Sequence, residues 1–134
     1  MMRKITYKLN EKVDPVELSA VFRQSGIKRP FDDIERLKSM IHHSDLFITA
    51  WDNQTLIGVA RAITDFSYCC YLSDLAVKQN YQNIGVGTEL VRLVHEQITD
   101  EVALILLSAP NAMEYYPRIG FERIQNGFII PRKQ

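Results

Sequence analysis

The stretch from Leu72 to Ile98 constrains this chain most, because a strand pattern, a glycine turn and a helix pattern follow one another without interruption. An apolar run that ends at Val77 leads through a polar loop into the turn QNIGVG at residues 82–87. Apolar side chains then recur with the period of a helix. They are Leu90, Val91, Val94 and Ile98.

A strand that passes through a glycine turn into a helix start is a typical site for an anion. Free backbone N–H groups of the first helical turn and the positive end of the helix dipole converge there. Gly85 and Gly87 allow the backbone to bend and a ligand to approach closely, because neither carries a Cβ atom. We interpret the turn as a cradle for a diphosphate; a tight connection without a ligand stays open as the alternative.

Two common phosphate-binding motifs fit this turn poorly. The nucleotide-hydrolase loop needs a lysine and a serine or threonine directly after its last glycine, whereas Thr88 and Glu89 follow Gly87. The dinucleotide-binding turn needs a third glycine, which would fall at Leu90. Both comparisons disfavour a nucleotide as the ligand.

Length and composition predict one globular domain that spans residues 1–134. Of these residues 46% are hydrophobic, which suffices for a sizeable core. The formal net charge is zero, and this argues against nucleic-acid binding, which requires a positive field. No apolar run reaches the ~20 residues of a membrane span, so we expect no membrane insertion.

Cysteine and histidine usage indicates a reducing compartment and no metal. Cys69 and Cys70 are adjacent and would point to opposite faces of a strand, so they form a poor disulfide pair. The cytoplasm is the expected location. His42, His43 and His95 do not have the spacing of metal ligands, and we expect no metal site.

Hydrophobic periodicity and turn residues predict a mixed sheet flanked by helices. Caps at Asp14 and Asp33 start two helices, and a short helix after Pro110 should end near Tyr116, because Pro117 follows. The continuously apolar run at 102–107 predicts a central strand covered on both sides. The remaining strands are expected at 5–9, 46–51, 56–63 and 68–77, with a final hairpin around Asn126-Gly127 that ends at Ile130.

Charged residues on apolar strand faces form a second group of candidates. Arg61 and Asp65 are four residues apart and share a strand face, so they either compensate nearby charges or line a substrate site. Asp74 alternates with Cys70 and Leu72 on a mostly apolar face. It is a candidate for a raised pKa and for base catalysis, and a carboxylate bound by loop amides is the alternative.

Two motifs, in this order, carry a resemblance to a known family. They are Gln82-x-x-Gly85-x-Gly87 and Ala112-x-x-Tyr115-Tyr116-x-x-x-Gly120-Phe121. Together with the expected order of elements, they resemble the GCN5-related N-acetyltransferases (GNAT) over nearly the whole chain. One departure is visible: many members carry an asparagine where this chain has Ala109, and Asn111 lies two residues away.

The resemblance implies a GNAT acyl-CoA N-acyltransferase fold of the α/β (α+β) class, with a central, mostly antiparallel mixed sheet. It implies acetyl-CoA as cosubstrate and a primary amine of a small molecule or peptide as acceptor. The amine would attack directly, with Tyr116 as general acid and Asp74, directly or through water, as base. A backbone N–H would stabilise the oxyanion.

By the same resemblance, three strand residues, the cradle and two later positions bind the cofactor together with Tyr116. These residues are Leu75, Ala76, Val77, Gln82, Asn83, Ile84, Gly85, Val86, Gly87, Thr88, Ser108 and Asn111. The acceptor pocket would lie between the helix pair, the strand with Arg61 and Asp65, and the C-terminal hairpin. Phe31 is a candidate wall of that pocket, or else a core side chain.

Two other functions stay open at this stage. A catalytically silent acyl-CoA-binding module that regulates a partner would bind CoA without releasing thiol in the presence of an amine. A nucleotide-binding domain would be protected from heat by ATP and not by acetyl-CoA. An apolar sheet edge also indicates a homodimer.

Overall fold

The computed structural model describes residues 4–134, and residues 1–3 lie outside it. Five strands form one sheet in the order β1-β2-β3-β4-β5. The first four strands are antiparallel neighbours, whereas β5 runs parallel to β4. Their bounds are Ile5–Leu9, Leu46–Asp52, Thr55–Thr64, Cys69–Val77 and Ala103–Ile105.

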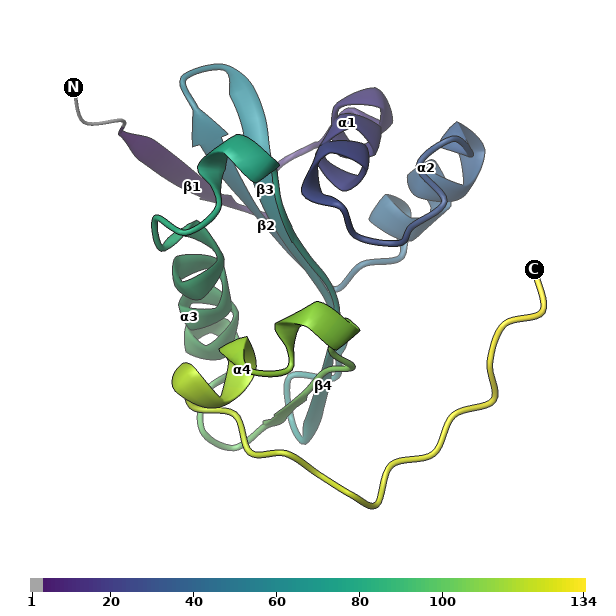
Figure 1. The fold of residues 1–134 in the computed structure, drawn as a ribbon, viewed down its shortest axis with the longest axis vertical. Helices are drawn as coiled ribbons and strands as arrows, with labels where there is room; N and C mark the ends of the chain where they lie inside the picture. The colour runs from purple at the N-terminus through teal and green to yellow at the C-terminus, as the bar shows by residue number, and fades with distance from the viewer. Residues whose placement is uncertain (1–3) are drawn as a thin grey trace.

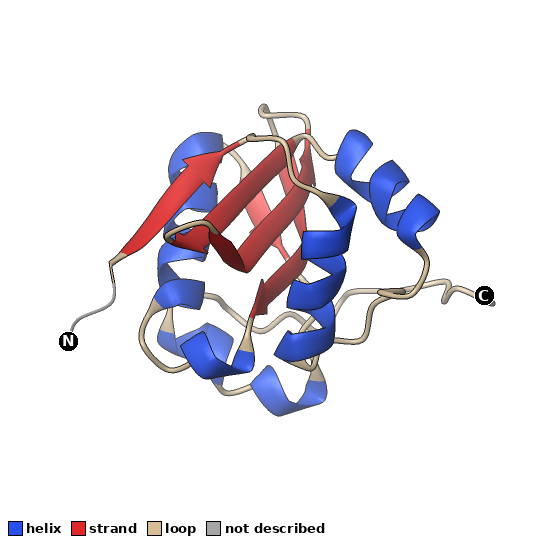
Figure 2. Cartoon of the chain, turned by 90° about the horizontal axis from the view of Figure 1, so that it is seen from above, coloured by secondary structure: helices blue, strands red, loops and turns tan. Residues whose placement is uncertain are grey.

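Helices cover both faces of this sheet (Figures 1 and 2). Helices α1 (Pro15–Ser25) and α2 (Ile34–His42) pack on one face over a core that includes Phe22 and Leu37. Helix α3 (Val86–Ile98) packs on the other face. Two short helical turns and α4 complete the described chain, at Gln79–Tyr81, Pro110–Ala112 and Tyr115–Arg118. None of the helices within 4–134 has the length and apolarity that crossing a bilayer requires.

Local caps start and stop the helices where the sequence predicts. The Asp14 carboxylate accepts the N–H of Val16 at 2.8 Å, and Pro15 occupies the first helical position of α1. The helix ends at Gly26 with φ of 85°, a left-handed conformation that costs glycine little. The Asp33 carboxylate caps α2 by accepting the N–H of Arg36 at 3.1 Å.

A β-bulge at Ser73 interrupts the pairing of β3 with β4. Asp74 lies opposite Arg61, whereas Leu72 already pairs with the next residue of β3. The extra residue reverses which face of the sheet the even-numbered side chains of β4 point to. Leu72 therefore packs in the α3 core, whereas Ala76 packs in the core under α1 and α2. The expectation that the even positions of this strand share one face is therefore wrong.

Strands β4 and β5 pair over a short distance and then separate. Their parallel register runs only from Cys69 opposite Ala103 to Tyr71 opposite Ile105. Strand β4 continues to Val77, so its edge beyond Tyr71 has no strand beside it on the β5 side in the described part of the chain. The two strands thus leave an open backbone edge next to the loop that enters α3.

The expected central strand at 102–107 is a short edge strand, which corrects the prediction. Ile105 and Leu107 are 43% and 64% exposed. The apolar run predicted a strand in the middle of the sheet with both faces covered. In the structure β5 is the last strand of the sheet, and within residues 4–134 no strand pairs with its second edge. Burial of this run depends on segments distant in sequence, which a local apolar pattern does not report.

Helix α4 continues through Pro117 and does not end at Tyr116 as predicted. Pro117 lies in the first turn, where a backbone N–H has no intrahelical acceptor, so the ring is tolerated. The helix ends instead at Arg118, and the chain turns at Gly120, whose φ is 105°. There the N–H of Phe121 donates to the carbonyl of Tyr116 at 3.1 Å.

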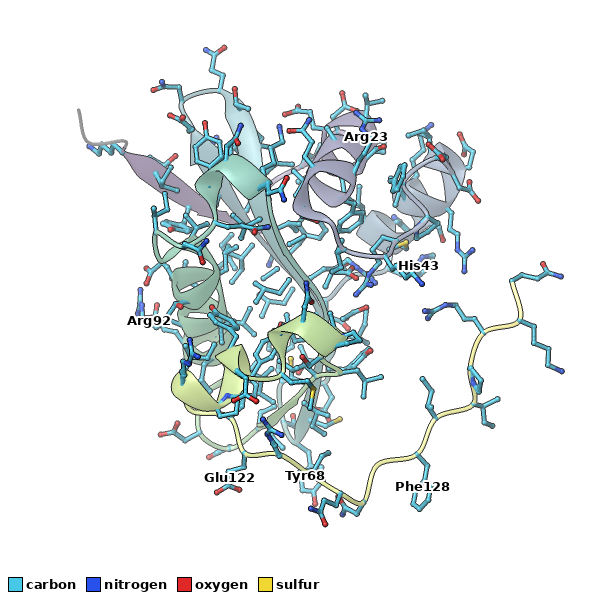
Figure 3. The ribbon with its side chains drawn as sticks, viewed as in Figure 1. Arg23, His43, Tyr68, Arg92, Glu122 and Phe128 are labelled. Carbon is cyan, nitrogen blue, oxygen red and sulfur yellow. The ribbon has the colours of Figure 1, made fainter. Side chains whose placement is uncertain are left out.

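The predicted C-terminal hairpin is absent from the described structure. Residues 121–134 contain no strand, and the chain runs away from the body of the molecule (Figure 1). A two-residue hairpin turn of the Asn-Gly type needs positive φ at both residues, and neither Asn126 nor Gly127 has it. The Phe128 side chain is 100% exposed and points away from the rest of the protein (Figure 3).

Candidate active site

The glycine turn has the backbone geometry that an anion site requires. Gly85 has φ of 91° and precedes the first residue of α3. The N–H of Glu89 donates to the carbonyl of Gly85 at 3.0 Å, so the N–H groups of residues 86–88 precede the first intrahelical bond. These groups and the helix dipole point at the loop, where Ile84 is 58% exposed.

Gly87 allows α4 to approach the first turn of α3. A Cβ atom at this position would stand 3.2 Å from the Tyr115 hydroxyl, closer than nine in ten real contacts of this kind. That hydroxyl also shares a hydrogen bond of 2.9 Å with Thr88 Oγ1. Because Gly87 has no side chain, Tyr115 of the second motif can pack against the cradle.

Gln82 fastens the cradle loop to the end of β4. Its Nε2 donates to the carbonyl of Val77 at 2.8 Å and to the carbonyl of Ser25 at 3.2 Å. The side chain therefore joins the turn to both β4 and the C-terminus of α1. Its amide holds the loop in place through these two bonds.

Asp74 is the centre of a buried charge network. Its two carboxylate oxygens accept hydrogen bonds from Nε of Arg29 and Nε of Arg61. None of the Asp74 side-chain surface is exposed, against 10% for Arg61 and 25% for Arg29. Each buried charge therefore has a partner, which is what burial of an ion demands.

The same two arginines hold the bulge of β4. Arg29 Nη2 donates to the carbonyl of Ser73 at 2.7 Å, and Arg61 Nη2 donates to Ser73 Oγ at 2.9 Å. Bulges of this kind are common beside active sites, where they redirect the strand. The loop between α1 and α2 is thereby tied to the point where β4 leaves β5.

Asp65 lies apart from this network. It follows the last residue of β3, and its carboxylate accepts the N–H groups of Ser67, Tyr68 and Cys69 at 2.9, 2.8 and 3.1 Å. These hydrogen bonds hold the pKa of Asp65 below its usual range. Asp65 and Arg61, expected to act on one face, have separate roles in the structure.

Tyr116 lies beside Tyr115, the residue whose hydroxyl contacts Thr88 at the cradle. It is half-buried, and its ring packs edge to face on Tyr115 and Phe121, with centroids 5.1 and 5.5 Å away. Burial raises the pKa of Tyr116 above its usual value of 10.0, the nearby Tyr115 adds to this, and the positive charge of Arg29 opposes it. Its phenol is therefore protonated at neutral pH, within electrostatic range of the arginine that binds the bulge.

The other expected cofactor residues lie at the end of β4, in the cradle and after β5. Leu75 is half-buried, and Ala76 and Val77 are 3% and 8% exposed at the end of β4. Ser108 Oγ donates to the carbonyl of Ala109 at 2.8 Å. Asn83, with φ of 66°, lies in the cradle loop, and Val86 is the buried first residue of α3. Asn111 lies in the exposed turn at Pro110–Ala112.

Phe31 is half-buried at the edge of the core under α1 and α2. Its carbonyl accepts the hydroxyl of Ser19 at 2.6 Å, which joins the α1–α2 loop to α1. This position fits the core interpretation directly. A contact with an acceptor remains a prediction.

Sequence reasoning missed Arg29 and Ser73. The only local signal was the basic loop Lys28-Arg29-Pro30, which by itself names no partner. Asp74 lies 45 residues later in the chain, and the bulge that aims it at Arg29 arises from strand register. In residues 4–134 no group of three or more metal-ligating side chains comes together.

Three comparisons with known proteins agree with this geometry. Residues 18–129 match the family model described as an acetyltransferase (GNAT) domain. The chain is 25% identical to the uncharacterized N-acetyltransferase ycf52 of Pyropia yezoensis, over 92% of this chain and 75% of that protein.

Among solved structures, it resembles a probable acetyltransferase of unknown function, SA2161, from meticillin-resistant Staphylococcus aureus. That likeness has a TM-score of 0.81 at 22% identity and covers 98% of this chain and 100% of the other. It also resembles the aminoglycoside N-acetyltransferase AAC(6')-Iy in complex with CoA, with a TM-score of 0.75 at 14% identity, over 100% and 98% of the two chains. At these identities the likeness shows a shared fold.

Proposed function

The chain belongs to the GNAT family of acetyl-CoA-dependent N-acetyltransferases, and we propose that it acetylates a primary amine of a small molecule or peptide. The family match covers residues 18–129, and the mixed sheet with helices on both faces matches solved acetyltransferases. The fold, the family and the enzyme class expected from the sequence are thus confirmed.

The open edge of β4 beyond Tyr71 supports this function most strongly. It runs from the bulge at Ser73 to Val77, and the cradle is fastened at that end. Free backbone groups of a strand edge can pair with an extended ligand, and the first turn of α3 can receive a pyrophosphate. Residues 75–77 and 82–88 would hold the cosubstrate along this path, with Ser108 and Asn111 on the β5 side.

When bound, acetyl-CoA supplies an activated acyl group and a thiolate leaving group. Tyr116 donates its phenolic proton to that thiolate, whose pKa is near ~8.5 if it behaves like cysteine. The raised pKa of Tyr116 keeps this proton available at neutral pH. A backbone N–H of β4 near the bulge stabilises the oxyanion formed by direct attack of the amine.

Asp74 serves as a positioning residue in this proposal. A base must reach the proton that it removes, within hydrogen-bond distance or through one water. The Asp74 side chain has no exposed surface and is bound by two guanidinium groups, so an acceptor amine does not contact it directly. Its carboxylate accepts hydrogen bonds from Arg29 and Arg61 and so holds both on the bulge, and the amine loses its proton to water.

The acceptor would enter beside the α1–α2 loop, where Phe31 offers an apolar wall next to Arg29. Asp65 lies in the turn between β3 and β4 and would contact the acceptor only at its outer rim. The free thiols of Cys69 and Cys70 suit a reducing compartment such as the cytoplasm.

The experiment is a screen of amines with purified protein and acetyl-CoA that reads free thiol, followed by Tyr116→Phe with the best acceptor. We expect kcat to fall by roughly a hundredfold or more, because a general acid typically contributes that much. The affinity for acetyl-CoA, measured by calorimetry, should stay unchanged.

Tyr68→Phe is the matched control, because Tyr68 is 78% exposed in the turn after β3. It should leave kcat unchanged. Full activity of Tyr116→Phe would remove Tyr116 from the mechanism. Binding of acetyl-CoA without thiol release for any amine would favour the silent acyl-CoA-binding module instead.

A further inference from the structure

We propose that Arg29 binds a carboxylate of the acceptor, so that the acceptor is an amine that carries a carboxylate close to its amino group. Amino acids are the simplest members of this class. Because it presupposes the proposed acetyl transfer, this assignment narrows the acceptor from any primary amine to one chemical class. The reason lies in the cluster at the β4 bulge, where Arg29 and Arg61 both bind Asp74.

This cluster keeps a net positive charge. Each guanidinium group carries a positive charge, and the single carboxylate of Asp74 can compensate only one of them. Within residues 4–134 no other carboxylate forms an ion pair with Arg29 or Arg61. The acidic residues of the α1–α2 loop, Asp32 and Asp33, are exposed, and Asp33 caps α2. A charge withdrawn from water needs a counter-charge, so the cluster favours an anion that arrives with a ligand.

The guanidinium of Arg29 is held in place and still has donors for a ligand. Its Nε donates to Asp74, its Nη1 to the carbonyl of Lys28 at 2.5 Å and its Nη2 to the carbonyl of Ser73 at 2.7 Å. A guanidinium has five N–H donors, so each Nη atom keeps one that no group within residues 4–134 accepts. Donors on two neighbouring nitrogens can bind both oxygens of one carboxylate. With 25% of its side chain exposed, Arg29 can be reached by such a group.

Arg61 has the opposite surroundings. Its Nη1 donates to the carbonyl of Met40 at 3.4 Å and to Ser44 Oγ at 3.5 Å, and its Nη2 donates to Ser73 Oγ at 2.9 Å. With its Nε in the ion pair, all three nitrogens are bound to groups of the protein, and only 10% of the side chain is exposed. Arg61 therefore fixes the cluster to the end of α2, whereas Arg29 presents its charge to solvent.

Arg29 also lies where an acceptor would react. Its carbonyl accepts the N–H of Phe31 at 2.8 Å, so the charge and the apolar wall belong to one tight turn of the α1–α2 loop. Burial raises the pKa of the Tyr116 phenol, and the positive charge of Arg29 opposes this shift, so the two groups are electrostatic neighbours. An acceptor with its carboxylate on Arg29 therefore brings a neighbouring amino group toward the proposed general acid.

The experiment compares matched acceptors that differ in the carboxylate. Thiol release from acetyl-CoA is measured for phenylalanine with phenethylamine and for lysine with cadaverine, the amines that lack the carboxylate. For the wild-type chain we expect kcat/KM in the more active pair to be about ten- to a hundredfold higher for the amino acid, because hydrogen bonds to charged groups contribute on that scale. A third pair, β-alanine with O-phosphoethanolamine, distinguishes a carboxylate from a phosphate, and β-alanine should be preferred.

Arg29→Gln is the test variant, because it leaves Arg61 and Asp74 as a balanced pair and should fold. Arg29 also holds the bulge, so the readout is the ratio of the two kcat/KM values within one pair, which cancels any general loss of activity. We expect this ratio to fall to about one in Arg29→Gln and to recover partly in Arg29→Lys, which restores the charge without the paired donors. Arg23→Gln is the matched control, since Arg23 is exposed in the last turn of α1 (Figure 3), and it should keep the wild-type ratio.

The possible outcomes separate this assignment from the proposed function. Thiol release that is as fast or faster for the amines without a carboxylate would overturn the role of Arg29 and leave acetyl transfer intact. A preference for O-phosphoethanolamine over β-alanine, or an unchanged ratio in Arg29→Gln, would overturn it in the same way. Absence of thiol release with every amine would overturn the proposed function itself, and the acceptor class with it.

Discussion

Asp74→Ala tests whether the buried carboxylate compensates the two arginines. Removing one partner of a buried ion pair typically costs about 3–5 kcal/mol, because the remaining charge is left unpaired. The two arginines that remain in this variant differ in their exposure to water. Arg29 keeps 25% of its side chain in water and can turn outward, whereas Arg61 keeps 10% and cannot. The loss of stability therefore comes mainly from the unpaired charge of Arg61. We expect a loss at the low end of this range, about 3 kcal/mol.

Such a loss is large for a domain of this size. Domains are usually stable by about 5–15 kcal/mol, so the variant should lose a substantial part of its free energy of unfolding. With an entropy of unfolding near 2.1 cal/mol/K per residue, the melting temperature should fall by about 10 °C for the 134 residues. Urea unfolding of the two proteins, with equal m-values, measures the difference directly.

The double variant Arg61→Met plus Asp74→Leu separates charge compensation from packing. Replacing both members of a buried ion pair by apolar residues of similar volume is often neutral. We expect this variant to be more stable than Asp74→Leu alone, since no buried charge on β3 is left unpaired. A loss below about 1 kcal/mol in Asp74→Ala, or a double variant no better than the single one, would refute the reasoning.

Substitutions at two further positions, Gly85 and Asp65, test local features of the backbone. Gly85→Ala places a Cβ at φ of 91° with open space around it, so it should cost about 1–2 kcal/mol of stability through strain alone, as read by thermal unfolding. Gly85→Asn is the milder comparison, and equal stability of all three proteins would mean that the turn relaxes. Asp65→Asn tests the turn after β3. Because the folded state lowers the pKa of Asp65, its stabilising effect is present above its ordinary value of 3.8 and is lost as pH falls through the lower folded value. The stability difference between wild type and Asp65→Asn should therefore be full at neutral pH and disappear in strong acid; a difference independent of pH would contradict this cause.

The sequence alone was sufficient for features that depend on neighbours along the chain. The cap at Asp14, the proline at position 15 and the stop at Gly26 each act within one helical turn. The glycine turn before α3 was recognisable for the same reason, since a left-handed residue followed by an amphipathic helix is encoded within a few positions. These local signals, in order, were enough to predict the family and most of the fold.

The position of Asp74 depended on the register of two strands. Asp74 alternates with apolar residues in the sequence, which suggested an isolated acid on an apolar face. The bulge at Ser73 turns it instead toward Arg29, 45 residues earlier in the chain, and toward Arg61. A register shift is set by the pairing of whole strands, and no single residue type marks it.

The C-terminal segment shows the same difference between local sequence signals and tertiary contacts. The dipeptide Asn126-Gly127 and the apolar residues around it have a strong local preference for a hairpin, yet the structure leaves them open and exposed. Local preference selects the conformations that a segment can adopt, and the burial of apolar surface selects among them. The sequence thus determined the cradle, the helices and the family by itself. The tertiary structure alone decided the partners of Asp74, the open edge of β4 and the exposed position of β5, because these depend on how segments far apart in the chain pack together.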